Sequence, residues 1–315
     1  MPPTSTTTLG PIWWLEEVEK RTNGQVKFET FWAGSLVKKG EDLDGISSGL
    51  LDVCVVNCTN YPDRLPLINV QFPVYFAPTD PKVLDPLYLA MFENADFIND
   101  IERYNTKFLF AAPVPGKDLS TTVPIKTLDD FAGKKIGAIG VYHPQALAAI
   151  DAAPVSMGIS GAYQALQTGV IEGQFLPTSA IYSYKLFEAA KHLTEMGLGA
   201  ELVGTTVVNR DVWDSLPPNI QQIMEETAID AYHYNIQLLA DQTVEAQQVM
   251  KDAGVTFYTL SQTEKTKWAS LLPNFPQEWV DEVNAKGQPG TEIMTLFIET
   301  AKELGHEFPR EWSVK

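Results

Sequence analysis

The sequence has few of the residues that build redox and metal sites. It contains two cysteines, Cys54 and Cys58, among 315 residues. In an extended segment their Cα atoms lie about 13 Å apart at ~3.3 Å per residue, whereas a disulfide requires less than about 7 Å. We therefore expect two free thiols. The four histidines show no metal-ligand spacing, so no metal site is expected; they are His143, His192, His233 and His306.

Positive charge and long apolar runs are also scarce. The 23 Lys and Arg residues face 40 Asp and Glu residues, which gives a net charge of −17 and no basic stripe. Nucleic acid is therefore not an expected partner. No run approaches the roughly 20 apolar residues that a membrane helix needs, so we expect no membrane span. The acidity is typical of a soluble surface, although a high-salt habitat or attraction of a cationic ligand would also account for it.

Sequence motifs of the common enzyme classes are missing. The chain contains no G-x-x-x-x-G-K-[S/T] or G-x-G-x-x-G phosphate loop between a strand and a helix. It also lacks a G-x-S-x-G nucleophile elbow and an H-E-x-x-H zinc motif. We therefore expect neither catalysis nor a cofactor.

The residues that are present predict a folded α/β protein. Hydrophobic residues make up 44% of the chain and aromatic residues 10%, which suits a globular protein of two lobes. Trp13 to Thr22 has the pattern of an amphipathic helix, and Gln25 to Trp32 alternates like a half-buried strand. A helix over Glu41–Leu50 and an apolar strand over Leu51–Asn57 follow. This order predicts a parallel sheet with crossover helices.

Further along, the pattern predicts additional elements. We expect a packing or lining loop over Pro62–Pro81, helices over Lys82–Glu102, Pro144–Ala152 and Ala180–Lys191, and strands over Lys107–Ala112, Lys134–Ile139, Val170–Phe175 and Leu202–Asn209. Two prolines, Pro217 and Pro218, open a pattern without proline or glycine up to Ala253. This predicts one helix of about 37 residues and ~55 Å; two helices broken near Asp241 are the alternative.

Five short segments carry a resemblance to a known family. They are Asp129–Ile136 (DDFAGKKI), Ala162–Gly169 (AYQALQTG), Glu172–Gln174 (EGQ), Lys185–Glu188 (KLFE) and Trp213–Pro218 (WDSLPP). Together they resemble the periplasmic substrate-binding proteins of TRAP transporters, the DctP family. The resemblance covers nearly the whole chain.

The resemblance implies a fold, a location and a partner. The fold would be a two-lobed periplasmic binding protein, each lobe a mixed, mostly parallel sheet flanked by helices, with a long helix bridging the lobes. Lobe I would comprise residues 1–113 and 203–240, and lobe II residues 114–202 and 241–315. The protein would be periplasmic, close by a hinge over a small solute and deliver it to the TRAP membrane permease. A ligand-sensing module is the alternative role. The opening MPPTSTTTLG resembles the loop after the family's first strand, so we expect that strand and any leader to be absent from this sequence.

By the same resemblance, the usual carboxylate clamp is missing. Most members place an arginine after the strand that ends in K-I, and many place an asparagine near the end of a later strand; here these positions are Gly137 and Leu176. A guanidinium binds a carboxylate in a bidentate, charge-assisted way. Leaving a buried charge unpaired costs roughly 3–5 kcal/mol. The loss of the clamp therefore argues against an ordinary organic acid as ligand.

We expect the ligand-binding residues to follow the strands. The candidates are Thr4, Ser5, Thr6, Trp13, Asn57, Tyr61, Gly137, Tyr142, Phe175, Tyr182 and Glu201. The three hydroxyls would bind a ligand alcohol or cap the first helix. Aromatic faces with Glu201 as counter-ion would hold an ammonium group, which predicts a small amine or amino alcohol such as ethanolamine. The alternatives are an aromatic or uncharged ligand, or an acid held by Lys117 and backbone amides.

Overall fold

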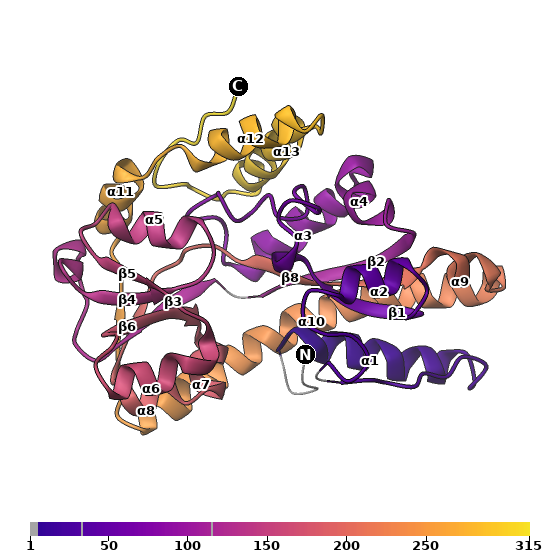
Figure 1. Cartoon of the computed structure of the whole chain (residues 1–315), viewed down its shortest axis with the longest axis horizontal. Helices are drawn as coiled ribbons and strands as arrows, with labels where there is room; N and C mark the ends of the chain where they lie inside the picture. Colours follow the sequence, from indigo (N-terminus) through magenta and orange to yellow (C-terminus); the bar gives the residue numbers. More distant parts are fainter. Residues whose placement is uncertain (1–5, 33, 115) are drawn as a thin grey trace. The chain divides into compact units, whose positions relative to one another are not determined.

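The computed structural model describes residues 6–32, 34–114 and 116–315. The chain divides into two compact units (Figure 1). Unit 1 comprises Met1–Val70, Asp85–Val114 and Glu201–Leu239, and unit 2 comprises Gln71–Leu84, Pro115–Ala200 and Ala240–Lys315. Compared with the lobes expected from the sequence, whose boundaries stay a prediction, unit 2 also takes in residues 71–84.

The described sheet of unit 1 has three strands in the order β1-β8-β2. These are β1 (Val53–Asn57), β8 (Glu201–Asn209) and β2 (Thr106–Val114). Both pairs are antiparallel, with Asn57 opposite Gly204 and Val114 opposite Glu201. The expected parallel pairing is therefore wrong in this sheet. The two strands joined by crossover helices do run in the same direction, but β8 returns from later in the chain and lies between them.

The strand predicted over Gln25–Trp32 is also wrong. This segment contains no strand, and Phe31 is 52% exposed. The backbone N–H of Phe28 donates to Glu19 Oε1 at 2.9 Å rather than to a strand. Alternation of apolar and polar residues does not make a strand unless a neighbouring strand completes the ladder, and no strand of the described residues pairs with this segment.

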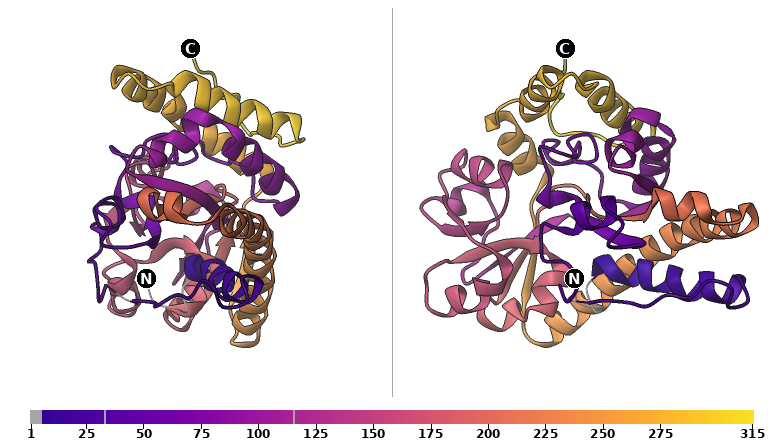
Figure 2. Two further views of the ribbon diagram at one scale, coloured as in Figure 1. Left: turned by 90° about the vertical axis from the view of Figure 1, so that its right-hand side faces the viewer. Right: turned by 45° about the vertical axis from the view of Figure 1, so that its right-hand side comes forward.

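Helices α1 (Thr6–Arg21) and α10 (Pro218–Asp252) lie side by side in unit 1 (Figure 2). Trp14 is fully buried, and its Nε1 donates to the carbonyl oxygen of Met224 at 3.1 Å. Unit 1 also contains α2 (Asp42–Ser47), the 3-10 helix η1 (Cys58–Asn60), α4 (Ala95–Glu102) and α9 (Arg210–Ser215). The single helix expected over residues 82–102 is two helices, α3 (Pro81–Glu93) and α4, because Asn94 caps α4 by accepting from Phe97 N at 3.0 Å.

Helix α10 runs unbroken for 35 residues, so the alternative of two helices is wrong. At 1.5 Å per residue it is ~52 Å long. Its residues up to Leu239 belong to unit 1 and those from Ala240 to unit 2. The long helix expected from the sequence is confirmed.

Unit 2 is built on a six-stranded mixed sheet with the order β5-β4-β6-β3-β7-β9. The strands are β5 (Ala153–Ser156), β4 (Lys135–Ala138), β6 (Gly173–Pro177), β3 (Lys117–Thr121), β7 (His192–Glu195) and β9 (Thr256–Thr259). Neighbours β5, β4 and β6 run parallel, as do β7 and β9, while β3 is antiparallel to both its neighbours. The α/β class with mixed sheets flanked by helices is confirmed.

Helices cover both faces of this sheet (Figure 1). One face packs against α6 (Ala162–Gln167), α7 (Thr178–Ser183), α8 (Leu186–Ala189) and the end of α10, around Ile171 and Leu176. On the other face lie α5 (Tyr142–Ala148) and α11 (Gln262–Leu271), joined by a 2.8 Å bond from Trp268 Nε1 to the carbonyl oxygen of Ala146. The remaining elements are η2 (Leu128–Phe131), η3 (Ile159–Gly161), α12 (Phe275–Ala285) and α13 (Gly290–Glu303).

The loop that includes residues 71–80 has a packing role, as expected. Tyr75 and Phe76 are buried beside Trp268 in the aromatic core of unit 2. The backbone carbonyl of Tyr75 accepts from Trp312 Nε1 at 3.2 Å. Phe76 adopts a φ of 60°, a left-handed conformation that such a side chain takes only where packing fixes it.

Both cysteines are free thiols, as predicted. Burial raises the pKa of Cys54 and of Cys58 to about 12, so both are protonated at neutral pH. Cys58 Sγ lies 3.0 Å from Thr205 Oγ1. Within the described part of the chain, no helix combines the length and the apolar character needed to cross a bilayer.

Candidate ligand-binding site

Three strands of unit 2 meet at one edge of its sheet. The parallel strands β4 and β6 end there at Ala138 and Pro177, and Gly137 is paired with Gln174. Strand β3 runs the other way, so Lys117, its first residue, lies opposite Pro177 at the same edge. Ligands of open α/β sheets bind beyond the carboxyl ends of parallel strands, so this edge is the candidate site in unit 2.

Gly137 is buried against the side chain of Gln174. A Cβ atom at position 137 would lie 1.9 Å from Gln174 Oε1 and 3.3 Å from Ile171 Cδ1. Because such contacts are impossible, any larger residue at 137 requires Gln174 to move. The glycine that replaces the expected arginine therefore makes room for a carboxamide.

The carboxamide of Gln174 is fully buried and incompletely bonded. Its Nε2 donates to the carbonyl oxygen of Phe175 at 3.3 Å. Its Oε1 has no hydrogen-bond partner among the described residues. Burying an unpaired polar atom costs about 1–3 kcal/mol, so this is an unfavourable arrangement.

The second clamp position, Leu176, is 5% exposed and belongs to the apolar cluster of Ile171, Ile181 and Leu186. It packs in the core and has no polar atom to offer a ligand. The sequence-based statement that this residue cannot hold a carboxylate therefore fits its surroundings.

Lys117 supplies positive charge at the edge. The side chain is half-buried, and Nζ lies 6.0 Å from the centroid of the Phe72 ring. The next residue, Asp118, is fixed at both carboxylate oxygens: Oδ1 accepts from Met196 N at 3.1 Å and Oδ2 from Thr178 Oγ1. Burial raises the pKa of Asp118 to about 6. These bonds fix the backbone on which Lys117 sits.

The aromatic candidates of unit 2 differ in how deeply they are buried. Phe175 is 1% exposed and stacks on Trp268, with ring centroids 6.4 Å apart. Tyr142 is half-buried beside Phe275 at 5.2 Å, and burial raises its pKa to about 12. Tyr182 is half-buried and stacks on Phe187 at 6.0 Å. Tyr142 and Tyr182 therefore keep some exposed surface, whereas Phe175 is a core residue.

In unit 1, two polar candidates already have partners. Asn57 Oδ1 caps η1 by accepting from Thr59 N at 3.2 Å and from Thr59 Oγ1 at 2.6 Å. Tyr61 is 6% exposed; its hydroxyl donates to Asp42 Oδ1 at 2.5 Å and accepts from Leu43 N at 3.2 Å. Both side chains stabilise local structure, and a contact with ligand stays a prediction.

Trp13 and Glu201 are half-buried in unit 1. Trp13 stacks on Tyr234 with ring centroids 4.9 Å apart and an interplanar angle of 19°. Glu201 begins β8, and its charge adds to burial in raising the pKa of Tyr88, which is fully buried. The roles of these two residues as aromatic wall and counter-ion stay predictions. Thr4, Ser5 and the side chain of Thr6 lie outside the described residues.

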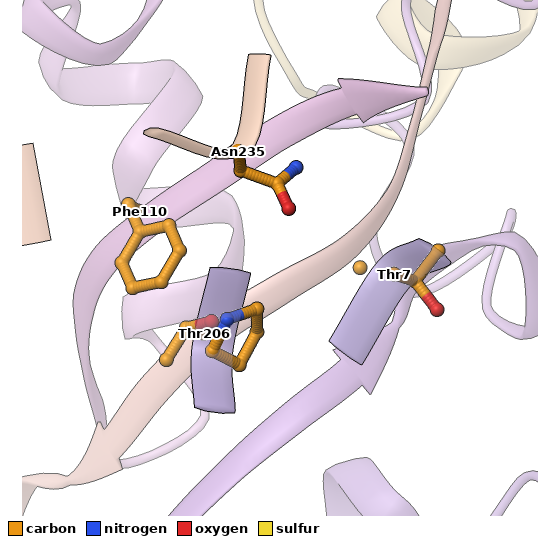
Figure 3. A pocket seen from close by; sticks show the side chains of 6 residues that line it. Thr7, Phe110, Thr206 and Asn235 are labelled. Atoms are coloured by element: carbon orange, nitrogen blue, oxygen red, sulfur yellow. The ribbon is translucent and has the colours of Figure 1, made fainter. Parts of the chain in front are cut away.

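A small cavity lies at the beginning of α1 in unit 1 (Figure 3). Its lining is Thr7, Pro11, Phe110, Gly204, Thr206 and Asn235, and its volume is about 10 Å³. Asn235 Oδ1 beside it accepts from Gly10 N at 3.1 Å. A cavity of this volume is close to the minimum for one water molecule.

Sequence reasoning missed Gln174 as a candidate, although the residue stands in the quoted E-G-Q segment. The signal is its strand register, because Gln174 is opposite Gly137 and a glycine leaves space for its neighbour. In the described part of the chain, no group of three or more His, Cys, Asp or Glu side chains is arranged to hold a metal ion.

Comparison with known proteins gives the same family from a family model and from a related protein. The family model described as "bacterial extracellular solute-binding protein, family 7" (DctP) matches residues 1–281. The C4-dicarboxylate-binding periplasmic protein DctP of Rhodobacter capsulatus is 29% identical over 276 residues, which are 86% of this chain and 81% of that protein.

Two solved structures share the fold. A TRAP periplasmic solute-binding protein of Desulfovibrio salexigens, in an open complex, has a TM-score of 0.85 and 22% identity over 97% of this chain and 95% of that one. A TRAP solute-binding protein of Chromohalobacter salexigens with bound D-glucuronate has a TM-score of 0.79 and 21% identity, covering 96% of this chain and 97% of that one.

Proposed function

Because the chain belongs to the DctP family of bacterial extracellular solute-binding proteins, family 7, we propose that it captures a small organic acid and delivers it to a TRAP membrane permease. Members of this family are periplasmic substrate-binding proteins that serve the transport of small organic ligands and are not enzymes. The class of ligand and the permease partner are the proposal.

The position of Lys117 carries the proposal of an acid. The lysine begins β3 opposite Pro177, at the edge where β4 and β6 end. A cation placed there can neutralise a carboxylate although Gly137 and Leu176 cannot. The named ligands of the relatives described above, a C4-dicarboxylate and D-glucuronate, are also carboxylates.

The amine or amino alcohol expected from the sequence has no such support. None of these relatives carries the name of an amine ligand. The expectation rested on the missing clamp at Gly137 and Leu176 and on aromatic side chains with Glu201 as counter-ion. A lysine at the same edge weakens the first of these reasons, because one ammonium group is sufficient to pair with one carboxylate.

The test is calorimetric binding with Lys117→Gln. Panels of carboxylic acids and of amines are titrated into the wild type, Lys117→Gln and the control Lys82→Gln, which replaces an exposed lysine of unit 2. The variant should weaken acid binding about 10- to 100-fold, since a charge-assisted hydrogen bond is worth about 1.5–3 kcal/mol and about 1.4 kcal/mol corresponds to tenfold. Binding of amines alone, or equal acid binding by Lys117→Gln, would refute the proposal.

A further inference from the structure

We infer that Phe72 is a specificity-determining residue of the proposed acid site. Its ring lies against the ligand next to the carboxylate that Lys117 binds, so the ligand class narrows to monocarboxylic acids that carry an aromatic ring. This inference rests on the proposed function, because it concerns the same edge of unit 2.

The first argument is the position of the Phe72 ring beside the cation. Lys117 Nζ lies 6.0 Å from the centroid of this ring. A carboxylate that pairs with the ammonium group approaches Nζ to about 2.7–2.9 Å. Atoms joined to that carboxylate on the side of the ring can therefore reach van der Waals contact with it. Phe72 is placed to contact the part of the ligand nearest to its carboxylate.

The register of the sheet agrees with this contact. Lys117 and Phe175 point to the same face, because Phe175 is opposite the second residue after Lys117 in the pairing of β3 with β6. Phe175 stacks on Trp268, and Tyr75 packs beside the same tryptophan with ring centroids 6.3 Å apart. The loop that carries Tyr75 and Phe72 therefore lies on the face to which Lys117 points.

The second argument is the surface that Phe72 keeps exposed. In residues 71–78 every residue is buried except Phe72, which is half-buried. The loop is fixed on both sides of Tyr75, whose hydroxyl lies 2.5 Å from His143 Nδ1 and whose carbonyl oxygen accepts from Trp312 Nε1 at 3.2 Å. A rigid segment thus presents one aromatic ring to a ligand, which is how binding sites combine apolar contact with a defined position.

The third argument is the apolar character of the other residues at this edge. Pro177 is opposite Lys117, and the chain that leaves β4 carries two exposed apolar side chains, Ile139 (43%) and Val141 (66%). Because β6 lies between β4 and β3, this chain is about 10 Å from Lys117, at two strand spacings. These residues offer no hydrogen-bonding side chain to the hydroxyls of a sugar acid and no charge to a second carboxylate, whereas an aromatic ring finds apolar contacts.

The experiment compares carboxylic acids with different bodies. Phenylacetate, succinate and D-glucuronate are titrated calorimetrically into the wild type, Phe72→Ala and the control Phe31→Ala, which truncates a phenylalanine of unit 1 that is 52% exposed. We expect the wild type to bind phenylacetate about tenfold or more tightly than either other acid. Phe72→Ala should reduce this preference to about threefold or less, because the aromatic contact and its buried area are lost. Phe31→Ala should keep the preference.

A second variant retains an apolar side chain at the same position. Phe72→Leu is tested with phenylacetate and cyclohexylacetate, which share the carboxylate and differ in whether the ring is flat. The wild type should prefer phenylacetate by about threefold or more, and Phe72→Leu should bind both acids equally, since only an aromatic side chain gains from ring stacking. General destabilisation would weaken both acids alike. Thermal melting checks that each variant is folded.

The outcomes separate the inference from the proposed function. A wild type that binds succinate or D-glucuronate as tightly as phenylacetate, or a preference for phenylacetate that survives in both Phe72 variants, overturns the role of Phe72 and leaves the acid proposal standing. A wild type that binds none of the four acids overturns the proposed ligand class and the inference with it.

Discussion

At the scale of single residues, the chain couples two positions that sequence reasoning considered separately. From the sequence, Gly137 was interpreted only as the absence of a positively charged side chain. In the fold it is the space that Gln174 occupies. An arginine at position 137 therefore requires the side chain of Gln174 to move.

This coupling predicts the behaviour of Gly137→Arg. Alone, the substitution should lower the free energy of unfolding by about 1–3 kcal/mol, because overpacking a buried site forces neighbours to move. Combined with Gln174→Ala, the loss should be largely recovered, since the atom that obstructs the new Cβ is gone. Chemical denaturation of both single variants and the double variant measures the coupling. A loss in the double variant equal to the sum of the two single losses would contradict the contact.

Asp118 gives a pH-dependent prediction. Its pKa is raised by burial to about 6, against about 3.9 in an unfolded chain. The protonated group therefore favours the folded state: its contribution is fully present below about pH 4 and is lost as the pH rises through about 6. Relative to Asp118→Asn, the wild type should lose about 1–3 kcal/mol of unfolding free energy between pH 4 and pH 7.

The measurement is denaturant unfolding of both proteins across that range. Burial also raises the pKa of Asp100 to about 6, but this residue is common to both proteins and cancels in the difference. A difference that is flat with pH, or that grows in the wild type's favour as the pH rises, would contradict the burial of Asp118.

At the scale of helices and strands, the local sequence pattern predicted correctly those elements whose formation does not depend on a distant segment of the chain. The long helix, β1 and β8 follow from periodicity and apolar runs in their own segments. The segment over residues 25–32 has an equally clear alternation and forms no strand, because a strand depends on a partner elsewhere in the chain. The sequence pattern also did not predict that β8 lies antiparallel between β1 and β2, because this pairing joins β2 to a segment about 90 residues away.

The continuity of α10 can be tested at Asp241, near which the sequence allowed a break between two helices. Replacing this exposed residue by alanine or by glycine removes the same side chain in both cases. In an unbroken helix the glycine variant should be less stable by about 1 kcal/mol. Thermal or denaturant unfolding of the pair gives the difference. Equal stability would show that residue 241 is not inside a helix.

At the scale of the whole molecule, the sequence predicted family, fold class and transport role, which the comparisons confirm. Its prediction of an amine ligand is not supported by the relatives. The net charge of −17 is typical of a soluble surface and does not identify a ligand; the missing arginine, the aromatic candidates and Glu201 led to the prediction of an amine. Only strand pairing puts Lys117 beside the end of β6, because two residues about 60 positions apart become neighbours through the sheet.

The most direct test of this account is the identity of the solute that the protein retains. Protein purified without added ligand is denatured, and the released small molecules are identified by mass spectrometry, with Lys117→Gln processed in parallel. We predict a small carboxylic acid, present at near-stoichiometric amounts in the wild type and depleted in the variant. A cationic amine released from the wild type would contradict the account.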